Sequence, residues 1–261
     1  MSLVVNRNNV SIVLHRPRYP ENIGAAARAI CNMGFEQLIV VEPENLDMTR
    51  VCTLATHAAA AVVNRLETYD HLKDALAAFQ YVVGTTARLG GERQIVSSPA
   101  GIAGKIAPIS QENRVAIVFG PEDRGLTNDD LRLCHALVNI PTADFSSLNL
   151  AQAVMVICYT LFSAQLPPPK EPVPRLASRE ELDGMYDQLK DILIRINYIL
   201  PGNPDYWMNK IRRTLSRIRL RGGDVSILRG ICRQIDWYSE KRYRDGLEDR
   251  AAGKNTAPED N

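Results

Sequence analysis

The chain has few cysteines, and none is arranged as a disulfide or metal motif. Its five cysteines are scattered, odd in number, and form no C-x-x-C pair. Reduced, mostly buried thiols are therefore expected, with neither a disulfide framework nor a zinc site. The four histidines are isolated from one another and show no H-x-x-x-H spacing. No bound metal is expected from such a distribution.

Long apolar runs, a strong net charge and the common phosphate loops are also missing. The longest apolar run, residues 148–162, is interrupted by Asn149 and Gln152 and is too short to span a bilayer comfortably. No apolar signal-peptide core is visible near the first residue, so a cytoplasmic protein is expected. A net charge of +1 means that any nucleic-acid surface must be local. The absence of G-x-x-x-x-G-K-[ST] and G-x-G-x-x-G argues against the usual nucleotide loops.

Fully apolar runs of strand length alternate with helical patterns over residues 1–165. The expected strands are residues 10–14, 37–41, 81–84, 115–119 and 137–140, with helices at residues 22–34, 70–79, 99–106, 127–134 and 150–162. Strands that are apolar on both faces and alternate with helices predict an α/β fold with a parallel sheet covered on both sides. Ligands of such sheets bind beyond the carboxyl ends of the strands.

A second part of the chain is expected after a proline-rich linker at residues 166–175. The pattern of residues 176–244 predicts a three-helix unit that starts at the capping box Ser178–Glu181. The second helix is expected to bury Trp207, Ile211, Leu215 and Ile218, and the third Ile227, Leu228, Ile231 and Ile235. Residues 245–261 show no apolar face and are expected to be disordered.

Polar side chains mark three places in the α/β part. Ser146, Ser147 and Asn149 precede the helix at residues 150–162, which is apolar on every side and is expected to be buried all round, in a core or against a partner chain. Asn22 and Arg28 are the polar exceptions on an alanine-rich helix. Each also has a purely structural interpretation: Ser147 and Asn22 as helix N-caps, and Arg28 as a solvated arginine.

Three loops rich in small residues follow strands of the expected sheet. They are residues 84–87, 120–125 and 140–149. Because the carboxyl ends of parallel strands share one edge, these loops can form an adenosine-sized pocket made largely of backbone donors and acceptors. A set of surface turns would use the same residues.

Basic residues gather in the C-terminal part with few acids among them. The strongest candidates for RNA contact are Arg212, Arg213, Arg217, Arg219 and Arg221. Solvated helix faces usually mix charges of both signs, so a stripe of nearly one sign favours binding to a polyanion.

Three segments together resemble a known family. Residues 22–29 (NIGAAARA), 118–128 (VFGPEDRGLTN) and 146–150 (SSLNL) are similar to the three successive motifs of the SpoU branch (TrmH-like) of SPOUT-superfamily RNA methyltransferases. Those enzymes methylate ribose 2′-hydroxyls with S-adenosylmethionine. The domain order, a catalytic part followed by a small basic helical unit, resembles TrmJ-type tRNA (cytidine/uridine-2′-O-)-methyltransferases, which modify nucleotide 32 of the anticodon loop.

The resemblance implies a C-terminal trefoil knot in the α/β domain, an obligate homodimer, S-adenosylmethionine as cofactor and tRNA as partner. By position it implies Arg28 as the catalytic arginine, with Asn22, Glu122, Ser147 and Asn149 shaping the active site. The implied cofactor pocket is formed by Thr85, Thr86, Ala87, Gly120, Ile140, Ser146, Ser147 and Leu148.

The match to the family departs from its pattern at two points. Pro121 stands where close relatives often carry arginine, and the loop at residues 141–145 is shorter by about a residue, both of which bear on substrate choice. Alternative functions are 2′-O-methylation of another tRNA or rRNA site, methylation of a base, or a non-catalytic RNA-binding knotted dimer.

Overall fold

The computed structural model describes residues 2–87, 96–143, 148–169, 171–200, 202–216 and 218–251. The chain forms two units, Met1–Arg179 and Glu180–Asn261. Among the described residues, none of the helices is both long enough and apolar enough to cross a membrane. Ser146, Ser147 and Arg217, three of the expected site residues, lie outside the described ranges.

The first unit is built on a sheet of seven strands with the order β3-β2-β1-β6-β4-β7-β5, and all pairings are parallel. The strands are β1 (Val10–His15), β2 (Gln37–Val41), β3 (Glu67–Tyr69), β4 (Tyr81–Thr85), β5 (Val96–Ser97), β6 (Val115–Phe119) and β7 (Ala136–Val138). The parallel α/β sheet expected from the sequence is confirmed. The short edge strands β3 and β5 were not expected, because each is too short to show a periodicity.

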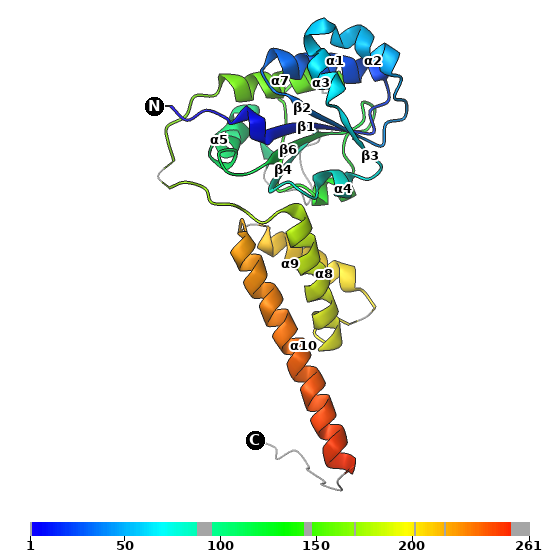
Figure 1. Cartoon of the computed structure of the whole chain (residues 1–261), viewed down its shortest axis with the longest axis vertical. Coiled ribbons are helices and arrows are strands. Elements are labelled where there is room, and N and C mark those ends of the chain that lie inside the picture. The colour runs from blue at the N-terminus through cyan, green and yellow to red at the C-terminus, as the bar shows by residue number, and fades with distance from the viewer. Residues whose placement is uncertain are drawn as a thin grey trace. The chain divides into compact units, whose positions relative to one another are not determined.

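Helices cover both faces of the sheet (Figure 1). One face is covered by α1 (Pro20–Asn32), α2 (Met48–Ala55), α3 (Ala60–Asn64), α5 (Pro99–Ile109) and α7 (Leu150–Ser163), and the other by α4 (Leu72–Leu76) and α6 (Asn128–Arg132). Short 3₁₀ turns lie at η1 (Arg7–Asn9) and η2 (His57–Ala59). Because strand residues alternate between two apolar cores, the central strands are buried on both sides, as the continuous apolar runs predicted.

Helix α1 begins earlier than expected, and this changes the role of Asn22. The N-cap is Tyr19 and Pro20 occupies the first turn, where a missing N–H costs nothing and the fixed φ suits a helix. The expected N-cap role of Asn22 is therefore wrong, and its side chain is available for other contacts. Gly24 brings α1 close to α2, since a Cβ there would lie 2.1 Å from the Val51 carbonyl oxygen.

Within the single chain, helix α7 is buried on one face only, so the expectation of burial all round in a core is wrong, and burial of its other face against a partner chain stays a prediction. Its inner face carries the fully buried side chains Leu150, Val154, Ile157, Cys158 and Leu161. On the other face, Val156, Tyr159 and Phe162 are 37%, 58% and 50% exposed. The single chain thus leaves a row of large apolar side chains on α7 uncovered.

The proline-rich segment is tied to the first unit at both of its ends, so it is not a free spacer. Leu166 pairs with Leu3 through two backbone hydrogen bonds. The buried Asn113 side chain donates to the Pro174 carbonyl at 3.1 Å and accepts from the Leu176 backbone N–H at 2.7 Å. Leu176 is 5% exposed and belongs to the apolar core. The boundary between the units therefore lies at Arg179, later than the expected residue 176.

The described residues of the second unit form three helices: α8 (Arg179–Arg195), α9 (Pro204–Leu215) and α10 (Gly222–Ala251). Three helices were expected, but α10 continues past Arg244 to Ala251, so residues 245–251 are helical where disorder was expected. Charged residues in this last stretch can form a solvated helix without burying an apolar face. The expected buried stripes are also partly wrong, since Trp207, Ile218, Ile227 and Ile231 are exposed while Met208, Val225 and Cys232 are buried.

Candidate active site

The carboxyl ends of three neighbouring strands meet at one edge of the sheet. Strand β4 lies between β6 and β7, with Gly84 opposite Val118 and Thr85 opposite Val138. The Thr85 hydroxyl donates to the Val118 carbonyl at 3.0 Å. The Thr86 N–H donates to the Val138 carbonyl at 2.9 Å. The loops after these strands therefore start side by side, as the sequence predicted.

The loop after β6 can only be built with glycine at its start. A Cβ on Gly120 would lie 2.4 Å from backbone atoms of Gly125 and Leu126, so the loop folds back against its own first residue. Gly125 has a φ of +66° and donates its N–H to the Pro121 carbonyl at 2.9 Å. This tight turn presents the next residue of the loop, Glu122, towards α1.

Glu122, Asn22 and Asn149 form a hydrogen-bonded brace that joins the three motif segments. The Asn22 side-chain N–H donates to Glu122 Oε1 at 2.6 Å, and Asn149 Nδ2 donates to Asn22 Oδ1 at 2.9 Å. Glu122 Oε2 accepts from the Arg18 backbone N–H at 3.0 Å. Asn149 Oδ1 also accepts from the N–H groups of Ala151 and Gln152 and so caps α7. Each member of the brace is engaged within the chain, so the brace positions the segments.

The brace leads to a prediction about Asn149, which both caps α7 and holds Asn22. Asn149→Ala is expected to lower the free energy of unfolding by about 2 kcal/mol, because a lost cap costs roughly 1 kcal/mol and a lost side-chain hydrogen bond a similar amount. Urea denaturation measures this change.

Ser98→Ala is the matched control, since the Ser98 side chain caps α5 by accepting from the Gly101 N–H at 3.1 Å and, among the described residues, is bonded to none of the three motif segments. Asn149→Asp keeps the capping oxygen but loses the donor to Asn22. Its loss of stability should fall between those of Asn149→Ala and Ser98→Ala. An Asn149→Ala variant no less stable than Ser98→Ala would contradict the brace.

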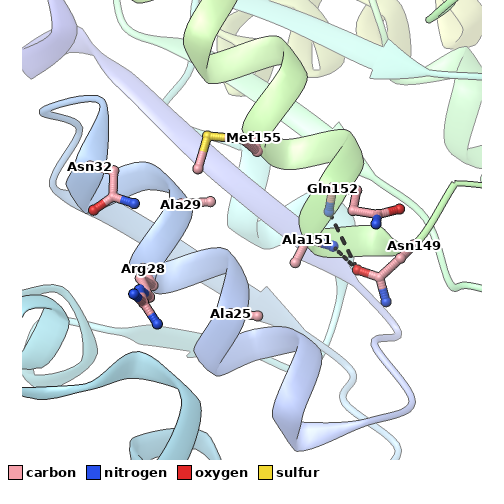
Figure 2. A pocket seen from close by; sticks show the side chains of 8 residues that line it. All are labelled: Ala25, Arg28, Ala29, Asn32, Asn149, Ala151, Gln152 and Met155. Carbon is pink, nitrogen blue, oxygen red and sulfur yellow. Dashed lines mark hydrogen bonds between the residues drawn. The ribbon is translucent and has the colours of Figure 1, made fainter.

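A cavity of about 370 Å³ lies beside the brace, between α1 and α7. Figure 2 shows the eight side chains that line it, with Asn149 and its capping bonds at the start of α7. They are Ala25, Arg28, Ala29, Asn32, Asn149, Ala151, Gln152 and Met155. The alanines form an apolar lining. Arg28, Asn32 and Gln152 are exposed polar residues, and none makes a side-chain hydrogen bond or ion pair with another described residue.

Among the described residues that line the cavity, Arg28 is the cationic one, and none is an aspartate, a glutamate or a histidine. Asn32 follows Arg28 by one helical turn on α1, and Gln152 follows Asn149 by three residues on α7. Sequence reasoning did not select these two residues. The available signal was their helical spacing from Arg28 and Asn149, which places each of them on the same side of its helix as the motif residue.

Histidine does not supply a base elsewhere in this region. His15, at the end of β1, is 2% exposed, and its ring nitrogens lie 3.6 Å from Asp130 and 3.7 Å from Glu42 without a hydrogen bond. Burial lowers the pKa of His15, and the adjacent Arg16 acts in the same direction, against the raising effect of the two carboxylates. His15 is therefore neutral at neutral pH and closed off from substrate.

The residues expected to hold S-adenosylmethionine have chemistry that fits its adenosine part. Thr85, Thr86, Gly120, Ile140 and Leu148 are half-buried, and Ala87 is exposed. None carries a charge, so a neutral base and ribose can be held by backbone groups and small side chains. The strand ends after β4, β6 and β7 place Thr85, Gly120 and Ile140 along one edge, and Asn139 fastens the Thr86 carbonyl at 2.8 Å.

The basic residues of the second unit do not all have the same surroundings. Arg212 donates to Asp183 at 3.2 Å, lies 3.8 Å from Asp187 and stacks over the Tyr186 ring at 4.4 Å. Asp183 is nearly buried, so the Arg212 guanidinium is committed to holding α9 against α8. Arg213, Arg219 and Arg221 lie at the surface. The structure thus argues for a structural role of Arg212, and the other three remain candidates for RNA contact.

Two family models match the chain along most of its length. The model of the SpoU rRNA methylase family matches residues 9–159. The model of the tRNA methyltransferase TrmJ C-terminal domain matches residues 180–248, which begins at the boundary between the two units.

Curated relatives match both parts. The chain is 35% identical over 236 residues to the tRNA (cytidine/uridine-2′-O-)-methyltransferase TrmJ of Klebsiella pneumoniae, covering 87% of this chain and 96% of that protein. It is 33% identical to the tRNA (cytidine/uridine/adenosine-2′-O-)-methyltransferase TrmJ of Pseudomonas aeruginosa, covering 86% and 92%. The crystal structure of TrmJ from Z. mobilis superposes with a TM-score of 0.75 at 30% identity, covering 87% of this chain and 98% of that one.

Proposed function

The chain belongs to the SpoU methylase family of S-adenosylmethionine-dependent RNA methyltransferases, and we propose that it methylates a ribose 2′-hydroxyl of tRNA. The observation that carries the choice of tRNA is the match of the second unit to the TrmJ C-terminal domain, together with relatives that align over both units. The proposed target is nucleotide 32 of the anticodon loop, as cytidine or uridine. A tRNA substrate implies action in the cytoplasm.

The proposed catalytic group is Arg28, and none of the described residues that line its cavity offers a carboxylate or imidazole as a base. A ribose hydroxyl is a poor nucleophile, so the site must stabilise the negative charge that develops on its oxygen. A guanidinium stays protonated in ordinary surroundings and suits this electrostatic role better than that of a base. When bound, S-adenosylmethionine would supply the electrophilic methyl group and leave as S-adenosylhomocysteine, and the hydroxyl proton would pass to water at the solvent-open cavity beside Arg28.

The remaining site residues have positioning and binding roles in this proposal. Asn22, Glu122 and Asn149 brace the three motif segments, so that the start of α7 stays beside the Arg28 helix. Asn32 and Gln152 offer free amides to the nucleotide held next to Arg28. The cofactor pocket is proposed at Thr85, Thr86, Ala87, Gly120, Ile140 and Leu148 with Ser146 and Ser147, and Ser147 is proposed to contribute to the active site as well.

Two features of the proposal concern the whole domain. A homodimer would cover the exposed row Val156, Tyr159 and Phe162 on α7, which is costly to leave in water. A knotted C-terminal part of the domain is proposed by analogy with the family.

Isothermal titration of the purified protein with S-adenosylmethionine tests the enzymatic role first. Saturable binding with a dissociation constant in about the micromolar to millimolar range is expected, as is usual for a small-molecule substrate of an enzyme. A non-catalytic RNA-binding dimer has no need of the cofactor. Absence of binding at millimolar concentration would therefore favour the scaffold over the enzyme.

A further inference from the structure

Helix α9 exposes aromatic side chains that are not buried in the core of the second unit. The sequence predicted Trp207 on the buried face, but the structure buries Met208 at 3% exposure and leaves Tyr206 and Trp207 51% and 43% exposed. Removing two adjacent large rings from water would be favourable, so their exposure on a short helix points to a binding surface.

These rings form a compact cluster with a cation. The centroids of Tyr206 and Trp207 lie 5.7 Å apart in an edge-to-face arrangement. The Lys210 ammonium lies 4.4 Å from the Tyr206 centroid and 5.1 Å from the Trp207 centroid. Asn203 caps the helix by accepting from the Tyr206 N–H, and Pro204 fixes its first turn. The cluster is therefore held on the rigid start of a helix.

The charge around the cluster is positive. The acid of the first turn, Asp205, accepts a hydrogen bond from Lys190 at 2.9 Å, and that bond lowers the pKa of Asp205. Its negative charge is thus already matched and does not cancel Lys210. Arg213 lies exposed one turn further along α9. A polyanion would meet cations on this face, beside the two rings.

We propose that Tyr206, Trp207 and Lys210 form a stacking platform for an unpaired base of the RNA substrate. The identity of that substrate as tRNA rests on the proposed function. Bases stack on aromatic rings whatever their sequence, and a nearby cation strengthens such contacts. A protein partner fits less well, because lysine is depleted from the cores of protein interfaces.

The chain has two tryptophans, Trp207 and Trp237, which makes the platform directly observable. In a full-length Trp237→Phe variant, all tryptophan emission comes from Trp207. Titration with an anticodon stem-loop RNA should quench this emission saturably, with the same midpoint as binding followed by anisotropy of a labelled RNA. Unchanged Trp207 emission while the RNA binds would overturn the proposal, and so would failure of the RNA to bind.

Substitution gives the second readout. Trp207→Ala should weaken RNA binding about tenfold, the size expected for one lost base stack, whereas Trp207→Phe should stay close to wild type. Tyr198→Ala is the matched control, because Tyr198 is 67% exposed in the same unit and no cation of the described residues lies over its ring. Equal losses in the Tyr198 and Trp207 variants would contradict the platform.

The outcomes separate this proposal from the proposed function. Quenching of Trp207 by RNA without methyl transfer would support the platform and contradict the enzymatic role. Methyl transfer to tRNA without quenching would support the enzymatic role and contradict the platform. Trp207 emission that shifts with protein concentration in the absence of RNA, together with a dimer mass that Trp207→Ala reduces, would assign the cluster to contact between two copies and overturn the platform.

Discussion

Replacing Arg28 with alanine is expected to lower the rate of methyl transfer to tRNA by about 10²–10³, the usual loss when one preorganised stabiliser of a developing oxyanion is removed. The effect follows from the cavity between α1 and α7, because the described residues that line it include the cation Arg28 but no acidic or imidazole side chain. Single-turnover transfer of a radiolabelled methyl group measures the rate. Affinity for S-adenosylmethionine, followed by calorimetry, should change little.

Two variants sharpen the test of Arg28. Arg28→Lys keeps the charge but loses the planar fork of donors, so it should retain part of the activity. Arg65→Ala is the control, since Arg65 is an exposed arginine paired with Glu36 at 2.6 Å on the surface and such pairs contribute little. An Arg28→Ala variant that methylates near the wild-type rate would remove Arg28 from the mechanism.

A protein that ends at Arg179 is expected to bind tRNA about ten- to a hundredfold more weakly at moderate salt, because it lacks the basic second unit. The logarithm of its binding constant should also fall less steeply with the logarithm of the salt concentration, by about 0.7–0.9 for each lost phosphate contact. Binding of S-adenosylmethionine should persist. Filter binding across a salt series measures both the affinity for tRNA and its dependence on salt.

The position of the truncation follows from the structure. A cut before residue 176 would remove Leu176, which is buried in the core of the first unit, and would confuse loss of RNA contact with loss of stability. Deletion of residues 252–261 alone is the control and should leave the salt dependence unchanged. Equal RNA affinity and an equal salt slope for the shortened and full-length proteins would show that the second unit does not contact tRNA.

Much of the first unit could be predicted because its strands are buried on both faces. A run such as Val115–Phe119 has no polar residue to fit any solvent-facing element, and so it predicts a central parallel strand directly. The meeting of the loops after β4, β6 and β7 then follows from parallel topology alone. Short edge elements such as β3 carry no comparable pattern, since three residues cannot show a period.

The brace and the cavity could not be predicted from spacing. Asn22 and Glu122 are a hundred positions apart, and only the fold brings them to hydrogen-bonding distance. Asn22 was predicted to be an N-cap because asparagine is favoured at that position. The helix instead begins at Pro20, about one turn before the start that an Asn22 cap would give. Arg28 could be selected through the family resemblance, but the cavity beside it depends on how α1 packs against α7.

The second unit shows a different limit of sequence reasoning. Apolar periodicity predicted its helices but not which face is buried, because large residues lie on more than one side of α9 and α10. Met208 and Cys232 are buried, while Trp207 and Ile231 are exposed. Charge was also misleading at Arg212, because its ion pair with Asp183 joins two successive helices through residues that lie 29 positions apart. Large apolar residues that a small unit leaves exposed indicate surfaces for binding.

Nucleoside mass spectrometry tests the central claim most directly. Unmodified tRNA would be incubated with the purified protein and S-adenosylmethionine carrying a deuterated methyl group, then digested to nucleosides and, in parallel, to mapped fragments. We predict labelled 2′-O-methylcytidine or 2′-O-methyluridine, located in the anticodon-loop fragment that contains nucleotide 32. Label on a base, or no label in tRNA when the cofactor is bound, would contradict the assignment of this chain as a tRNA ribose methyltransferase.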